Sequence, residues 1–207
     1  MAMSDPAEWF GECHPLAEQL GSADGLLELG SVSVILQLRP VKDMTSLGRF
    51  LRTYHAQILL PIELRAIQSA HGHASRNEAR ELVALDRSLV GQVVLSDFAH
   101  ASQRIGQMQL KKLRPLRDSR LLQRYLRAVE DGHAHGWHTL VYGLTLAIYS
   151  LPLRQGLMGY AHQTTRGFIH SAARSLRLSE SQCRRLFDGV CAGLPIAVES
   201  LLRQSHV

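Results

Sequence analysis

Hydrophobic residues recur at helical spacing along most of the chain from residue 45 onward. The first series is spaced three or four residues apart and comprises Leu47, Phe50, Leu51, Tyr54 and Ile58. Thr45 or Ser46 precedes it as a candidate helix cap, because a hydroxyl accepts a hydrogen bond from a first-turn backbone N–H. Pro61 suits the first turn of a separate helix over residues 60–71, where its missing N–H is not needed. The pattern therefore predicts two consecutive helices here.

Similar series continue toward the C-terminus, separated by start and stop signals. Ser75 with Glu78, and Ser179 with Gln182, have the spacing of capping boxes. Residues 137–150 are apolar around most of a helical circumference, which is typical of a central buried helix. The whole pattern predicts an all-α, single-domain helical bundle of about eight helices.

Strand-like alternation is nearly absent. Residues 31–38 (SVSVILQL) are the exception, and a short strand, an extended segment and a helix start are all compatible with them. We therefore expect a helical domain over residues 45–207, preceded by a partly irregular N-terminal arm over residues 1–44.

Composition narrows the class of protein. The 207 residues suffice for one buried core, and the net charge of +5 suits an acidic protein partner. Nucleic-acid binding is the alternative, but Lys and Arg are dense only at residues 111–114, so no nucleic-acid partner is expected. Cys13, Cys183 and Cys191 form no disulfide pattern, which favours the reducing cytoplasm. No signal peptide or membrane-length apolar run is evident, so no membrane association is expected.

Three histidines within six residues, His133, His135 and His138, are the most conspicuous candidates for chemistry. Neutral imidazole is the commonest metal ligand, so a small metal-dependent helical enzyme is one hypothesis. The alternative is histidines at helix ends, since no regular four-ligand pattern accompanies them. Carboxylates such as Glu63 and Asp86 are expected at helix starts or on polar faces. We predict no catalytic residue, metal ligand or cofactor.

Several short motifs in the second half of the chain occur in a recognisable order. Ser102 and Gly106 are four residues apart in the stretch 97–106, with Ala99 before them. Residues 138–143 read HTLVYG, and a helical run containing Tyr160 leads to SAAR at residues 171–174. Together these motifs resemble the UreF family of urease accessory proteins, and the resemblance extends from about residue 47 to residue 198.

Three differences from the family pattern make the chain a divergent relative. Residues 177–180 (RLSE) stand where the family has Pro-Leu-Gly-Gln, and Ala99 replaces a family arginine. Residues 21–30 (GSADGLLELG) lack the family's Leu-Pro-x-Gly-Gly-Phe-x-x-Ser element. The fold is nevertheless expected to follow the family, because it depends on the spacing of buried positions.

The resemblance implies a non-catalytic scaffold in metalloenzyme maturation. UreF proteins are all-α, dimerise, and bind a second accessory protein and a GTPase, and the assembly delivers nickel to the urease apoprotein. By position in the motifs, the residues expected to bind partners are Arg174, His138, Tyr160, Ser102, Gly106 and Arg177. A purely structural role is the alternative for each of them. Arg174 belongs to a C-terminal third rich in arginine, whose planar fork pairs carboxylates at interfaces.

Overall fold

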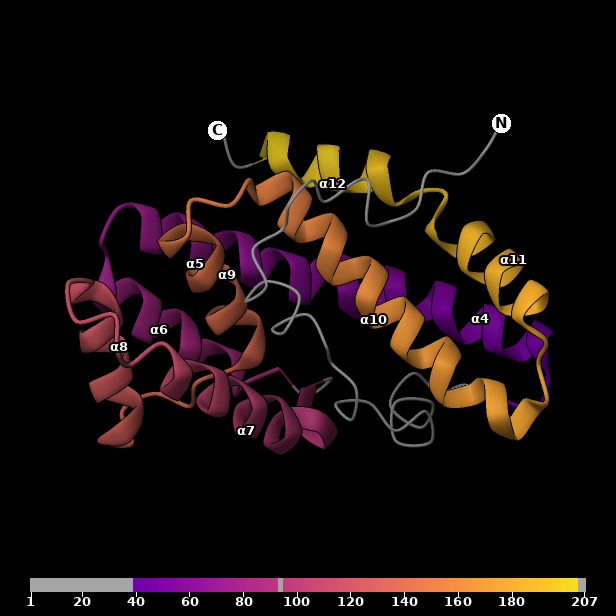
Figure 1. Cartoon of the computed structure of the whole chain (residues 1–207), viewed down its shortest axis with the longest axis horizontal. Coiled ribbons are helices and arrows are strands. Elements are labelled where there is room, and N and C mark those ends of the chain that lie inside the picture. Colours follow the sequence, from indigo (N-terminus) through magenta and orange to yellow (C-terminus); the bar gives the residue numbers. More distant parts are fainter. Residues whose placement is uncertain (1–38, 93–94, 205–207) are drawn as a thin grey trace.

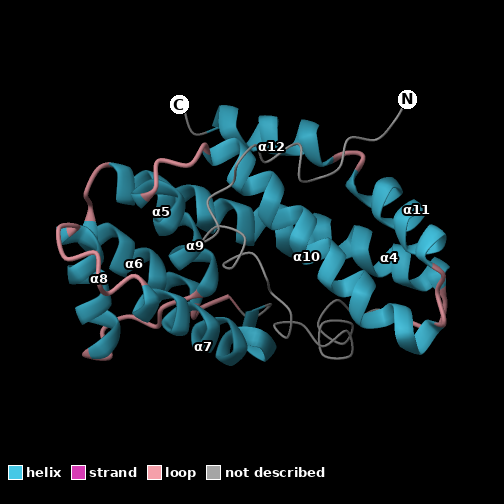
Figure 2. Cartoon of the chain, viewed as in Figure 1, coloured by secondary structure: helices cyan, strands magenta, loops and turns pink. Residues whose placement is uncertain are grey.

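In the computed structural model, the described residues are 39–92 and 95–204, and they contain helices but no strand (Figure 2). The predicted all-α class is confirmed. Residues 31–38 and most of the predicted N-terminal arm lie outside the described residues, so those predictions remain untested. No helix within the described ranges is both long enough and apolar enough to cross a lipid bilayer.

The described helices are numbered from α4 (Figure 1). They are α4 (Met44–Tyr54), the π-helical segment η1 (His55–Leu64), α5 (Arg65–Ser75), α6 (Ala79–Leu89), α7 (Ser96–Lys112), α8 (Arg120–Glu130), α9 (His138–Ile148), α10 (Leu153–Leu176), α11 (Glu180–Cys191) and α12 (Leu194–Arg203). The longest helix, α10, crosses the molecule diagonally (Figure 1). At one end α10 packs against α4 and α11, and α6, α7 and α8 form the other end.

The first long helical element does not break at Pro61 as the sequence predicted. Helices α4, η1 and α5 follow one another without an intervening loop, and Pro61 lies inside η1. Hydrogen bonds in a π-helix join residues five apart, so Pro61 avoids the α-helical spacing in which a prolyl ring collides with the carbonyl four residues earlier. Pro61 is exposed, whereas Ile58, Leu59 and Leu64 are fully buried, so packing holds the segment in place.

The helix caps only partly follow the sequence prediction. The Ser179–Gln182 capping box is present, but Asp43 caps α4, accepting a 2.7 Å hydrogen bond from the N–H of Ser46. The predicted Ser75–Glu78 box is wrong, because Ser75 is the last residue of α5 and its hydroxyl donates to the His71 carbonyl. The carboxylate of Glu78 is instead engaged by Arg76 and His73.

The predicted central helix is α9. Its neighbours α5 and α7 pack closely against it because a glycine lies at each contact. A Cβ on Gly143 would collide with the Ile67 carbonyl of α5 and lie 3.0 Å from the Ala70 side chain. A Cβ on Gly106 of α7 would lie 2.6 Å from the His138 nitrogen at the start of α9. Since Cβ atoms do not approach backbone this closely, glycine at both positions sets how near α5 and α7 lie to α9.

A Gly106→Ala substitution is expected to lower the free energy of unfolding by about 2–3 kcal/mol, because α7 must move away from α9 to admit the methyl group. Gly189→Ala is the matched control, since a Cβ there meets nothing within 4 Å. In an exposed helix this control should raise stability by about 0.5–1 kcal/mol. Urea denaturation measures both values, and equal effects from the two substitutions would contradict the close-approach argument.

Candidate functional site

The junction of α10 and α11 is a tight corner that carries several arginines. Helix α10 ends at Arg177, a non-glycine residue in the left-handed region with φ of 51°. The next N–H, that of Leu178, donates a 3.0 Å hydrogen bond to the Ala173 carbonyl and so caps the helix end. Ser179 then starts α11 immediately. The short turn therefore places the arginines of both helices on one corner of the molecule.

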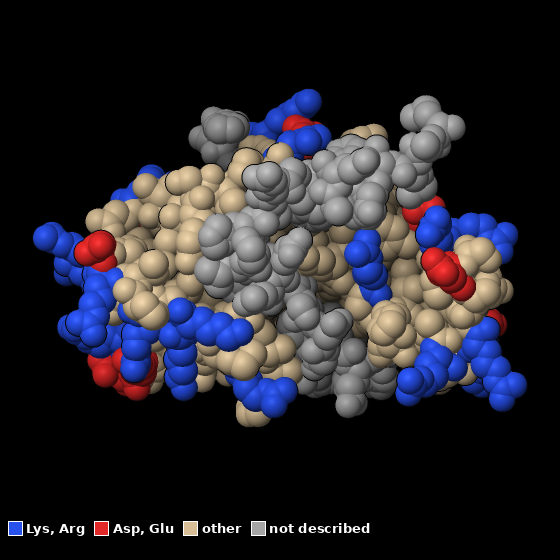
Figure 3. Space-filling view, in the orientation of Figure 1, with Lys and Arg blue, Asp and Glu red and all other residues tan. Residues whose placement is uncertain are grey.

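We call this set the arginine corner, and its members are exposed on α10, the turn and α11: Arg166, Arg174, Arg177, Arg184 and Arg185. Lys and Arg atoms gather at this end of the molecule, on the right in Figure 3. Arg166 lies over the Phe187 ring, and Arg184 is 3.4 Å from Glu180. Arg174, Arg177 and Arg185 form no ion pair with any residue in the described ranges. Such unpaired guanidinium groups suit a partner that presents carboxylates.

The structure does not bring the other predicted binding residues to this corner. Ser102, Gly106, His138 and Tyr160 are all buried within the chain. The Ser102 hydroxyl accepts a 3.3 Å hydrogen bond from the His138 N–H, and the His138 ring packs 5.9 Å from the Tyr160 ring. The geometry places these four residues in the framework that joins α7, α9 and α10, while Arg174 and Arg177 are exposed to solvent.

A buried carboxyl group that the sequence analysis assigned to a polar face lies beneath α10. Glu63 of η1 accepts hydrogen bonds from the Tyr54 hydroxyl at 2.5 Å and the Tyr160 hydroxyl at 3.3 Å. Burial raises the pKa of Glu63 to about 7, although both hydroxyl hydrogen bonds act in the opposite direction. Burial, reinforced by Glu63, also raises the pKa values of Tyr54 and Tyr160. The apolar run preceding Glu63 in the sequence was the available signal for its burial.

A second buried carboxylate, Asp86 of α6, holds the loop that contains the clustered histidines. It accepts hydrogen bonds from the His135 N–H at 2.5 Å, the Gly136 N–H at 2.9 Å and the Tyr125 hydroxyl at 2.6 Å. Arg87 adds a 2.7 Å hydrogen bond to the His133 carbonyl. Asp86 was also expected on a polar face, and it is instead completely buried because it satisfies backbone donors that the loop leaves open.

The three histidines of this loop have different surroundings. His133 is exposed, His135 is half-buried and His138 is fully buried. Among the residues that the structure describes, no three His, Cys, Asp or Glu side chains gather as metal ligands. The hypothesis of a metal-dependent enzyme built on His133, His135 and His138 therefore gains no geometric support.

Comparison with known proteins adds one finding. The sequence model of the UreF family matches residues 41–190, which include every helix from α4 to α10 and nearly all of α11. The matched region thus contains both the buried framework and the arginine corner. A search of the curated proteins finds no match.

The raised pKa of Glu63 generates a pH-dependent stability. The unfolded carboxyl ionises near its ordinary pKa of 4.5, whereas the folded one ionises near 7, so stability is greatest below pH 4.5 and falls as the pH rises to 7. The free energy of unfolding falls by about 3 kcal/mol over this pH range. The Glu63→Gln variant lacks this titration. The free energy of unfolding of the variant, minus that of the unsubstituted protein, should therefore rise between pH 4.5 and 7 and then level off.

Urea denaturation between pH 4.5 and 8 measures this difference. His55, whose pKa burial lowers to about 4, titrates in both proteins, so its contribution cancels. Ser171→Ala is the control, because Ser171 is exposed and the substitution neither adds nor removes a titratable group, so the difference should be flat. A flat difference for Glu63→Gln as well would show that Glu63 ionises normally in the folded protein.

Proposed function

The chain belongs to the UreF family of urease accessory proteins, and on this premise we propose that it is a non-catalytic scaffold for inserting nickel into urease. The family match over residues 41–190 is the observation that carries the proposal, and membership implies an accessory role in urease maturation. The proposed partners are a second accessory protein, a GTPase and the urease apoprotein. The proposed active form is a homodimer, and the proposed compartment is the cytoplasm.

The arginine corner supports a role in partner binding. Arg174 and Arg177 project their charges without a carboxylate partner among the described residues, so no internal ion pair must break before a partner binds. An interface arginine is worth most when it pairs a carboxylate bidentately in a desolvated setting. We therefore place the acidic surface of one accessory partner against this corner.

The backbone at Arg177 supports the same assignment. The left-handed conformation with φ of 51° favours glycine, and a residue with a Cβ adopts it at an energetic cost of roughly 1 kcal/mol. Glycine would suit the end of α10 better than arginine does. An arginine at a position where it slightly destabilises the fold points to a use for its side chain.

Two substitutions test the scaffold role at this corner. Arg177→Gly should leave the fold intact or stabilise it by about 1 kcal/mol, since glycine adopts the turn freely. Both Arg177→Gly and Arg174→Ala should weaken capture of the co-expressed accessory proteins and GTPase by about fivefold or more, or about 1 kcal/mol per side chain. Arg203→Ala, at the exposed end of α12, is the control and should not change capture.

Co-purification and thermal denaturation are measured on the same variants. Unchanged capture together with a lower thermal midpoint for Arg174→Ala would make Arg174 a structural residue. The wider proposal is tested by nickel-dependent urease activation in a system that lacks only its UreF component. Failure of the chain to restore activation, with a folded protein present, would contradict the accessory role in that system.

A further inference from the structure

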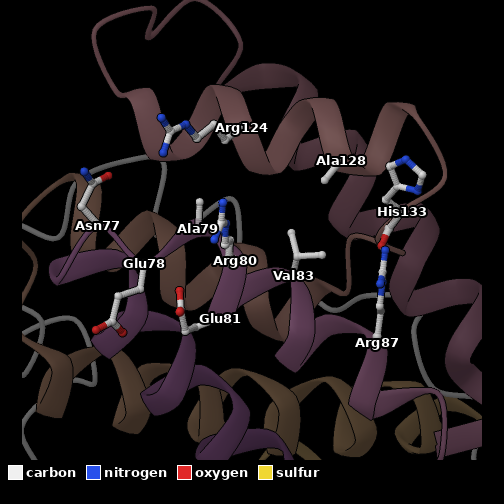
Figure 4. A pocket seen from close by; sticks show the side chains of 10 residues that line it. All are labelled: Asn77, Glu78, Ala79, Arg80, Glu81, Val83, Arg87, Arg124, Ala128 and His133. Atoms are coloured by element: carbon white, nitrogen blue, oxygen red, sulfur yellow. The ribbon is translucent and has the colours of Figure 1, made fainter.

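A groove of about 790 Å³ lies between α6 and α8, at the end of the molecule opposite the arginine corner (Figures 1 and 4). Its apolar wall is formed by half-buried side chains, namely Ala79 and Val83 of α6 and Ala128 of α8. Arg80, Arg87 and Arg124 line it together with His133 at one end (Figure 4). The groove thus combines a small apolar surface with a basic margin.

The positive charges of this groove are incompletely balanced. Arg80 and Arg124 are exposed and form no ion pair with another described residue. Among the residues that the structure describes, Arg87 donates only to a neutral carbonyl, that of His133. The carboxylate of Glu78 is paired with Arg76 at 2.8 Å, which leaves Glu81 as the opposing charge along the groove. The groove therefore suits a ligand that carries both carboxylates and apolar side chains.

The chain itself contains a segment of that composition outside the described residues. Residues 1–38 hold no Lys or Arg and six of the 18 carboxylates, so the other 169 residues hold all 23 Lys and Arg and 12 carboxylates. Within residues 5–20 the acidic side chains are Asp5, Glu8, Glu12 and Glu18. Large apolar side chains stand between them: Trp9, Phe10, Leu16 and Leu20. All Lys and Arg therefore lie outside residues 1–38, and the charged side chains within those residues are all acidic.

We propose that residues 5–20, the acidic segment, dock in the groove between α6 and α8 of the same chain. The carboxylates pair with Arg80 and Arg124, while an apolar side chain covers Ala79, Val83 and Ala128. This contact goes beyond the accessory role and does not depend on it.

The segment is long enough to reach the groove. Helices α4, η1 and α5 run consecutively over residues 44–75, a length of about 48 Å at the helical rise. The groove begins at Asn77 and Glu78, directly after the end of α5. The 18 residues between the segment and Arg39, residues 21–38, span up to about 65 Å when extended.

Tethering favours the segment over other occupants. A covalently attached ligand has an effective concentration in the millimolar range when its linker spans the distance. A second copy of the chain or a separate acidic protein must bind from dilute solution and lacks this advantage. Because the contact pairs carboxylates of the segment with the exposed side chains of Arg80 and Arg124, it weakens as salt screens these charges.

Cross-linking in the full-length chain tests the proposal, because the acidic segment carries a native thiol, Cys13. A cysteine is introduced in the groove by Ala128→Cys or, on the opposite wall, by Val83→Cys. Ser171→Cys on the exposed side of α10 is the control position. A short bismaleimide is added at low protein concentration, and linked peptides are identified by mass spectrometry. The thermal midpoint of each variant verifies that it is folded.

Monomeric links from Cys13 to the groove thiols should exceed the link to the control thiol several-fold. The yield of these links should fall several-fold in high salt. It should also fall several-fold when Arg80→Glu and Arg124→Glu reverse the charge of the groove. Adding Glu8→Arg and Glu12→Arg to that variant should restore the yield. Equal yields at groove and control positions would overturn the proposal, and so would insensitivity to charge reversal. Links found only in products of twice the monomer mass would also overturn it, since they would place a second copy in the groove.

Discussion

The close packing of α9 against α5 and α7 is the constraint on which the remaining structure depends. Gly143 and Gly106 remove the side chains that would separate these helices, so backbone meets backbone at both contacts. Nearly every residue of α9 is buried, and the rings of His138 and Tyr142 pack against the Tyr160 ring of α10. The Tyr142 hydroxyl also donates a 3.0 Å hydrogen bond to the Gly156 carbonyl, so α9 contributes to the position of α10.

Two buried carboxyl groups connect this core to its surroundings in different ways. Asp86 accepts three hydrogen bonds, two of them from backbone N–H groups, and so fixes the loop that leads into α9. Glu63 has only two hydroxyl partners, and burial therefore raises its pKa to about 7. Asp86 thus ties the loop to α6, whereas Glu63 links η1 to α10 through a contact that depends on pH.

Exposed arginines lie at both ends of the molecule. At one end the arginine corner combines exposed guanidinium groups with a backbone position at Arg177 that favours glycine. At the other end, Arg80 and Arg124, which form no ion pair with another described residue, border a groove with an apolar wall. Both features are exposed surfaces of a chain that belongs to the UreF family of urease accessory proteins.

The sequence by itself determined the helical class, the buried character of α9, the Ser179 cap and the family, because these follow from local spacing and short motifs. It placed Arg174 and Arg177 as candidates but could not separate them from His138, Tyr160, Ser102 and Gly106, since motif matching does not report burial. Only the tertiary structure decided that helix continues through Pro61 and that Glu63 and Asp86 lie inside. Those outcomes depend on partners distant in sequence, Tyr160 for Glu63 and the 135–136 backbone for Asp86, which no local pattern specifies.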